Sequence, residues 1–200
     1  MVAILLVWAP GAGAGEGPPV VVVLGDSLTA GYGLPPEQAF PARLAARLAG
    51  SGIAARVVDA GVSGDTSAGG RARLDWVLGD KPDLVILELG ANDALRGIDP
   101  AATRANLDDL VGRLVARGIR VLLTGMRAPP NLGRDYGAEF AAIFPELAAK
   151  HRVALYPFFL DGVAAEPELN QADGIHPNAR GVEVIVGRIA PRVIQLLEGG

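Results

Sequence analysis

A serine near the N-terminus is a candidate nucleophile. Ser27 lies in the segment Gly25-Asp26-Ser27, directly after the apolar run 20–24, and further glycines follow it. A serine at the end of a buried strand, surrounded by glycines, allows a substrate to come close. Gly-Asp-Ser is also ordinary turn and N-cap chemistry, so a plain turn stays an alternative. A phosphate-binding loop is a second alternative, although the segment lacks the Gly-Lys-Ser/Thr that such loops carry.

A serine nucleophile needs a base, and the chain has two histidines, His151 and His176. Asp173 precedes His176 by three residues and can orient its imidazole from within one turn, as an acyl-transfer triad requires. A loop histidine beside an N-capping aspartate is the alternative. His151 ends a helix-like stretch, where a cation suits the helix dipole, and we interpret it as structural or surface. His176 is therefore the candidate base and Asp173 its candidate partner.

Two further segments offer hydrogen-bond donors to a developing oxyanion. Asn92 follows the apolar run 84–89 and can donate from its amide, and Gly64 follows the run 54–58 and can bring a backbone N–H close. With the amide of Ser27 they would form an oxyanion hole, whose donors are worth about 3 to 4 kcal/mol each. Either residue alone is equally a turn glycine or a helix cap. Their shared position at strand ends favours the functional interpretation.

The elements that must position these residues alternate between buried strands and amphipathic helices. Such alternation with short connections predicts a three-layer α/β/α sandwich around a parallel sheet of about five strands. Ligands bind beyond the carboxyl ends of such strands, where the candidate residues stand. We expect Pro191 to kink or interrupt the last helix. The predicted strands are 20–24, 54–58, 84–89, 120–124 and 153–156, and the predicted helices are 40–49, 101–117, 139–150 and 182–197.

Composition limits the class of protein. The 200 residues, half of them hydrophobic, suffice for one well-filled core, and the net charge of −4 contains no block of like charge. We therefore expect a small-molecule partner and no nucleic acid. The absence of cysteine excludes disulfides, a thiolate nucleophile and cysteine-ligated metals. No metal or organic cofactor is expected.

The N-terminus has the features of a targeting segment. The apolar run 2–8 precedes a small-residue stretch, 9–17, as at the end of a secretory signal peptide, although the usual basic leader is missing. A plain apolar N-terminus, with a cytoplasmic protein, is the alternative. The run is far shorter than the roughly 20 residues of a spanning helix, so stable membrane insertion is not expected. We therefore expect residues 1–17 to be a signal peptide or disordered and residues 18–200 to be one domain.

Four motifs resemble, in the same chain order, the four blocks of the SGNH (GDSL) hydrolases, and together they span nearly the whole domain. They are GDSLTAGYGL, GVSGDTSAGG, LGANDALRG and DGIHPN. The chain is similar to the bacterial branch of acyl-CoA thioesterase, arylesterase and lysophospholipase through SGDTSAGG, ALRG and MRAPPNLGRDYGAEF.

The resemblance implies the flavodoxin-like fold of these enzymes, export to the periplasm or secretion, and hydrolysis of acyl esters or thioesters. It also implies roles for individual residues. Ser27 would be the nucleophile, His176 the base and Asp173 its orienting group, and the oxyanion donors would be Ser27, Gly64 and Asn92.

Other functions stay open at this point. The same four blocks occur in carbohydrate O-acetylesterases, an acyltransferase is also possible, and a non-catalytic acyl-binding module is the third alternative. We expect a monomer acting on a small acyl substrate. Leu132, Tyr136, Phe140 and the segment 158–160 are candidates for an acyl groove, with core packing as the commoner fate of such residues.

Overall fold

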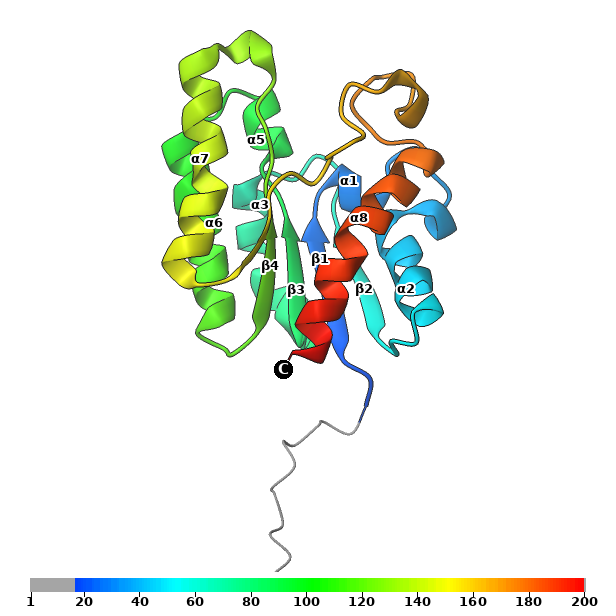
Figure 1. Cartoon of the computed structure of the whole chain (residues 1–200). Coiled ribbons are helices and arrows are strands. Elements are labelled where there is room, and N and C mark those ends of the chain that lie inside the picture. The colour runs from blue at the N-terminus through cyan, green and yellow to red at the C-terminus, as the bar shows by residue number, and fades with distance from the viewer. Residues whose placement is uncertain (1–16, 200) are drawn as a thin grey trace, which may run out of the picture.

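One parallel sheet organises the part of the chain that the computed structural model describes, residues 17–199 (Figure 1). Its strand order is β2-β1-β3-β4-β5, and every neighbouring pair is parallel. The five-stranded parallel sheet expected from the sequence is confirmed. The strands are β1 (Val20–Gly25), β2 (Arg56–Gly61), β3 (Leu84–Glu88), β4 (Arg120–Thr124) and β5 (Ala154–Tyr156).

Strand β2 begins and ends later than the predicted range 54–58. It is an edge strand whose residues are mostly part-buried or exposed, so its apolar residues do not mark its bounds. Its register with β1 sets them instead, from Val20 opposite Arg56 to Gly25 opposite Gly61. This register places the ends of β1 and β2 side by side.

Helices cover both faces of the sheet and complete the expected three layers (Figure 1). On one face α2 packs against α8, and on the other α6 packs against both α3 and α7. The long helices are α2 (Phe40–Gly50), α6 (Pro100–Val115), α7 (Arg134–His151) and α8 (Ala179–Glu198); the short ones are α1 (Ser27–Ala30), α3 (Ser67–Ala72), α4 (Leu74–Val77) and α5 (Ala91–Leu95); the 3₁₀ turns are η1 (Pro36–Gln38), η2 (Leu78–Asp80), η3 (Pro130–Leu132) and η4 (Pro167–Leu169).

Of the two effects expected of Pro191, a kink or an interruption of the last helix, the interruption is wrong, because α8 runs through this residue to Glu198. A proline inside a helix removes one backbone donor, which would otherwise bond the carbonyl four residues earlier, here that of Gly187. Ile189, Ala190 and Val193 around it are fully buried. Burial of this apolar face outweighs the loss of one hydrogen bond.

The strand order places the site. The chain leaves β1 for β2 on one side and reaches β3 on the other, so β1 and β3 flank the switch point of the sheet. In open α/β sheets, ligands bind beyond the carboxyl ends of the strands at this point. Helices α1 and α5 begin there (Figure 1). Within residues 17–199, no helix combines the length and apolar character needed to span a bilayer.

Candidate active site

Ser27 is the first residue of α1, and its neighbours give it this position. The carboxylate of Asp26 caps the helix, with Oδ1 accepting from the amide of Leu28 at 3.0 Å. Position 25 has no space for a side chain, because a β-carbon there would lie 2.0 Å from Oγ1 of Thr29, so a glycine is needed. The strand therefore runs into the helix without a gap, and the serine lies at the carboxyl edge of the sheet.

The structure brings Ser27, His176 and Asp173 together in a line of hydrogen bonds. Oγ of Ser27 lies 2.9 Å from Nε2 of His176, and Nδ1 of that ring lies 2.7 Å from Oδ2 of Asp173. The amides of Ile175 and His176 both donate to Oδ1 of Asp173 at 3.0 Å. The ring of Tyr32 lies against the imidazole, with 4.7 Å between ring centroids. The imidazole is thus oriented from both sides.

These contacts also set the protonation of the pair. The hydrogen bond from the His176 side chain, together with the two backbone amides, lowers the pKa of Asp173 to about 2. An ionised carboxylate can only accept hydrogen bonds, so Nδ1 of His176 is the donor to Asp173. In the neutral imidazole, Nε2 then has the lone pair that can accept a hydrogen bond. Nε2 is the atom that faces Ser27, which is the arrangement a general base requires.

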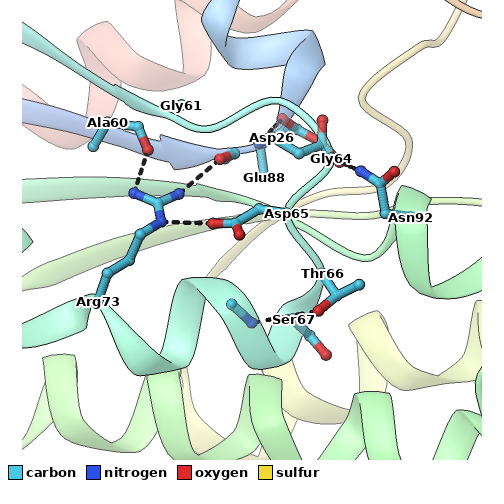
Figure 2. A network of polar contacts seen from close by, with 12 residues as sticks. Asp26, Ala60, Gly61, Gly64, Asp65, Thr66, Ser67, Arg73, Glu88 and Asn92 are labelled. Carbon is cyan, nitrogen blue, oxygen red and sulfur yellow. Dashed lines mark hydrogen bonds and ion pairs between the residues drawn. The ribbon is translucent and has the colours of Figure 1, made fainter.

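The three candidate oxyanion donors come from the segments after β1, β2 and β3, and hydrogen bonds connect these segments. Nδ2 of Asn92 donates to Oδ2 of Asp26 at 2.9 Å, which leaves its second N–H for a substrate (Figure 2). The carbonyl of Gly64 accepts from the guanidinium of Arg96 at 2.8 Å. Gly64 has φ +84°, where a side chain would be strained, so glycine suits this turn.

Two buried carboxyl groups beneath the site were not singled out by the sequence. Burial raises the pKa of Asp26 to about 6, although its bonds to Leu28 and Asn92 oppose the rise. Glu88 is fully buried, Oε2 accepts from Oγ1 of Thr29 at 2.9 Å, and Oε1 has no hydrogen-bond partner within residues 17–199. Burial, and then the charge of Asp26, raise the pKa of Glu88 well above its usual value. The sequence signal that could have identified Glu88 is that it is the one charged residue inside the apolar run 84–89.

We predict that replacing Glu88 with glutamine removes a pH-dependent cost to stability. The unfolded chain loses the proton of this carboxyl above a pKa of 4.5, whereas the folded protein keeps it until its raised pKa. The free energy of unfolding of the parent therefore falls with rising pH in this window, by about 1.4 kcal/mol per pH unit from this group. Urea denaturation between pH 5 and pH 8 should show that the free energy of unfolding of Glu88→Gln increases relative to that of the parent as the pH rises.

The control for this prediction is Glu139→Gln, at an exposed position of α7, which should follow the parent at every pH. Equal pH dependence in parent and Glu88→Gln would mean that Glu88 ionises alike in the folded and unfolded states.

His151 does not belong to the line of hydrogen bonds at Ser27. Its Nε2 lies 2.5 Å from Oδ1 of Asp108, so it links α7 to α6, in agreement with its structural interpretation. Among the described residues, no group of three or more His, Asp and Glu side chains is arranged to bind a metal ion.

A cavity of about 670 Å³ opens beside Ser27 and His176. Of the groove candidates, Phe158 and Leu160 line this cavity, whereas Phe140 and Phe159 are fully buried in the core, which is the commoner fate expected for such residues. Tyr136 is not among the residues that line the cavity, and its hydroxyl donates to the carbonyl of Ile98 at 2.7 Å. The apolar side chains of the lining include Leu95, Met126, Pro129, Phe158, Leu160 and Ile175.

The chain is similar to several known proteins. Residues 23–184 match the model of the GDSL-like lipase/acylhydrolase family. The chain is 44% identical over 178 residues to Esterase TesA of Pseudomonas aeruginosa, which covers 88% of this chain and 89% of that protein. It is 42% identical over 159 residues to thioesterase 1/protease 1/lysophospholipase L1 of Escherichia coli, with 79% and 75% covered. The structure of the psychrotrophic esterase EstA from Pseudoalteromonas sp., inhibited by monoethylphosphonate, has a TM-score of 0.85 at 31% identity, with 90% and 98% covered.

Proposed function

The chain belongs to the GDSL-like lipase/acylhydrolase family, and from this premise we propose that Ser27, His176 and Asp173 are its catalytic triad. Family membership makes the protein an ester-bond hydrolase, and its relatives are named as esterase, arylesterase and thioesterase. The observation that carries the proposal is the unbroken line of hydrogen bonds, 2.9 Å from Ser27 to His176 and 2.7 Å from His176 to Asp173, beside an apolar cavity.

In the proposed mechanism, Oγ of Ser27 attacks the carbonyl carbon of the substrate while Nε2 of His176 takes its proton. The negative charge that develops on the carbonyl oxygen accepts hydrogen bonds from the amides of Ser27 and Gly64 and from the free N–H of Asn92. The tetrahedral intermediate then expels the alcohol or thiol, which takes the proton from His176. Water, activated by the same imidazole, cleaves the acyl-enzyme and restores Ser27.

Asp173 stabilises the imidazolium in both steps without receiving its proton. A carboxyl group whose pKa lies at about 2 stays ionised while the neighbouring imidazole takes up and releases a proton. The Asp26–Asn92 hydrogen bond of 2.9 Å fixes the amide of Asn92 before the substrate arrives. Donors oriented in advance need no reorganisation when charge develops, which is why they are effective.

The substrate class follows from the cavity and from the relatives. The cavity of about 670 Å³ has mostly apolar side chains around Ser27, which suits an acyl chain rather than a sugar ring. We propose that a monomer hydrolyses aryl esters, thioesters such as acyl-CoA, and lysophospholipids, without a nucleic-acid partner. Its relatives are named as arylesterase and as thioesterase and lysophospholipase. Carbohydrate O-acetylesterase activity is the competing function.

A substrate panel separates these functions. We expect purified residues 17–200 to hydrolyse p-nitrophenyl esters and acyl-CoA thioesters with medium-length chains faster than they release acetate from acetylated glycans. Acetate release as the only activity would favour the O-acetylesterase. Failure of the folded protein to turn over any member of the panel would favour the acyl-binding module. Product analysis with added alcohol would detect acyl transfer.

We also propose that the protein is exported and that residues 18–200 form one domain. The apolar run 2–8 and the small residues 9–17 support export, and nearly all of this segment lies outside the described residues. The mass of the protein recovered from the periplasm of a Gram-negative host tests this. We expect a chain that starts near residue 17, and an uncleaved chain in the cytoplasm would exclude export.

A further inference from the structure

An arginine outside the triad connects the segments that carry two of the proposed oxyanion donors. Arg73 follows α3, and its guanidinium makes three hydrogen bonds (Figure 2). Nε donates to Oδ2 of Asp65 at 2.6 Å, one Nη donates to the carbonyl of Ala60 at 2.7 Å, and the other donates to the carbonyl of Gly25 at 2.8 Å. A single side chain thus contacts the end of β1, the end of β2 and the loop after β2.

Two residues that accept hydrogen bonds from Arg73 are close in sequence to the proposed oxyanion donors. Gly25, the last residue of β1, lies two residues before Ser27, and Asp65 directly follows Gly64. The segments of Ser27 and Gly64 follow different strands, β1 and β2. The ends of these strands are paired, with Gly25 opposite Gly61, and the backbone bond from Val62 to Gly25 at 3.1 Å extends this pairing. Arg73 adds a side-chain link to this pairing, and its bond to Asp65 holds the residue that directly follows Gly64.

The surroundings of Arg73 are formed to accept it. Its side chain is 18% exposed and that of Asp65 is 17% exposed, in contrast to most arginine pairs of this protein. Gly69 leaves space for the carboxylate of Asp65, because a β-carbon there would lie 2.2 Å from Oδ1. A guanidinium presents its donors from three nitrogens in one rigid plane, so it can reach three separated acceptors at once, whereas an ammonium carries its three donors on a single nitrogen.

We propose that Arg73 is a positioning residue of the oxyanion hole, which holds the amide of Gly64 in place relative to that of Ser27. The proposal rests on the oxyanion role proposed above for these two amides. Stabilisation of an oxyanion requires donors at about 2.7 to 3.1 Å from the place where charge develops, and a displacement of about 1 Å can cost 10²-fold in rate. Loss of Arg73 should therefore act on the transition state more than on substrate binding.

The test compares Arg73→Gln and Arg73→Lys with the parent on one p-nitrophenyl ester and one acyl-CoA thioester. For Arg73→Gln we expect kcat to fall by about 10- to 100-fold while KM stays within about twofold. The kcat of Arg73→Lys should lie between those of the parent and Arg73→Gln, because lysine keeps the charge but not the three contacts. The rate of labelling by a fluorophosphonate should fall in parallel, because its phosphonyl oxygen needs the same donors.

Arg71→Gln is the matched control. Arg71 lies two residues before Arg73, on α3, and also pairs with an aspartate, Asp109 of α6 at 2.8 Å. Its guanidinium makes no hydrogen bond to the strand ends among the described residues. Its kcat should stay within about twofold of the parent, and its melting temperature should change little, because the Arg71–Asp109 pair is exposed. An equal loss of kcat in Arg73→Gln and Arg71→Gln would mean that Arg73 contributes only to the general stability of the fold, and it would overturn the proposal.

Other outcomes separate this proposal from the proposed function. Folded Arg73→Gln with parental kcat, or with its whole loss in KM, would overturn the positioning role while leaving the triad intact. If Arg73→Gln does not fold, Asp65→Asn tests the same contact, because it weakens only the bond beside Gly64, and a smaller loss of kcat is then expected. Activity that survives in Ser27→Ala would instead overturn the proposed function itself.

Discussion

A Ser27→Ala variant is expected to lose about 10⁶-fold in kcat on every ester that the parent hydrolyses, because no other nucleophile replaces the hydroxyl. Removal of His176 should cost about the same, and the double variant should be no worse than either single one, since the two groups act as a unit. Stability should change little, because Ser27 is only partly buried and, in the described part of the chain, its side chain bonds only His176.

The measurement combines turnover with covalent labelling. A fluorophosphonate should modify the parent at Ser27, as shown by peptide mapping, and should fail to modify Ser27→Ala or His176→Ala. Ser51→Ala, at the exposed end of α2, is the control and should be labelled and active like the parent. Labelling that persists in folded Ser27→Ala would assign the nucleophile to another residue.

The second large effect is expected from Asp173→Asn, at about 10⁴-fold in kcat, with substrate binding nearly unchanged. The neutral amide cannot fix the proton on Nδ1, so the ring can take the tautomer in which Nε2 carries it and cannot accept from Ser27. The substitution keeps the size of the side chain, and one oxygen is still available for the amides of Ile175 and His176. The loss should therefore be one of chemistry and not of loop structure.

Steady-state kinetics with circular dichroism of the folded variant measures this. Asp75→Asn, on a 78% exposed aspartate that pairs with Arg113, should keep parental kinetics. The side chain of Asp173 is 37% exposed, so water competes for its hydrogen bond to His176, and the kinetics of Asp173→Asn measure how much this bond contributes to catalysis. A kcat within about tenfold of the parent would restrict Asp173 to capping the loop and assign the orientation of His176 to other contacts, such as the ring of Tyr32.

Much of the fold was predictable because its signals are local. Buried parallel strands are short β-branched runs, as in 20–24 and 120–124, and each needs a crossover helix. Errors occurred where a signal was weak or was overruled by packing. The edge strand β2 is too exposed for its apolar residues to mark its bounds, and Pro191 lies inside a helix that burial of its apolar face keeps intact.

The candidate chemistry was also present in the sequence. Asp173 and His176 are three residues apart, so their contact depends on one turn, and Ser27, Gly64 and Asn92 each follow a strand that ends at the same edge. What each of these residues can do follows from its type and from its place after a strand. The arrangement of one motif against another does not.

Only the tertiary structure decided which groups meet across long separations. The contacts between Asp26 and Asn92, between Arg73 and the carbonyl of Gly25, and between Ser27 and His176 join residues 66, 48 and 149 positions apart. No local pattern encodes such pairs, because they depend on strand order and register. Burial is a property of the same packing, and it determines both the raised pKa of Glu88 and whether an aromatic residue such as Phe158 or Phe159 faces the cavity or the core.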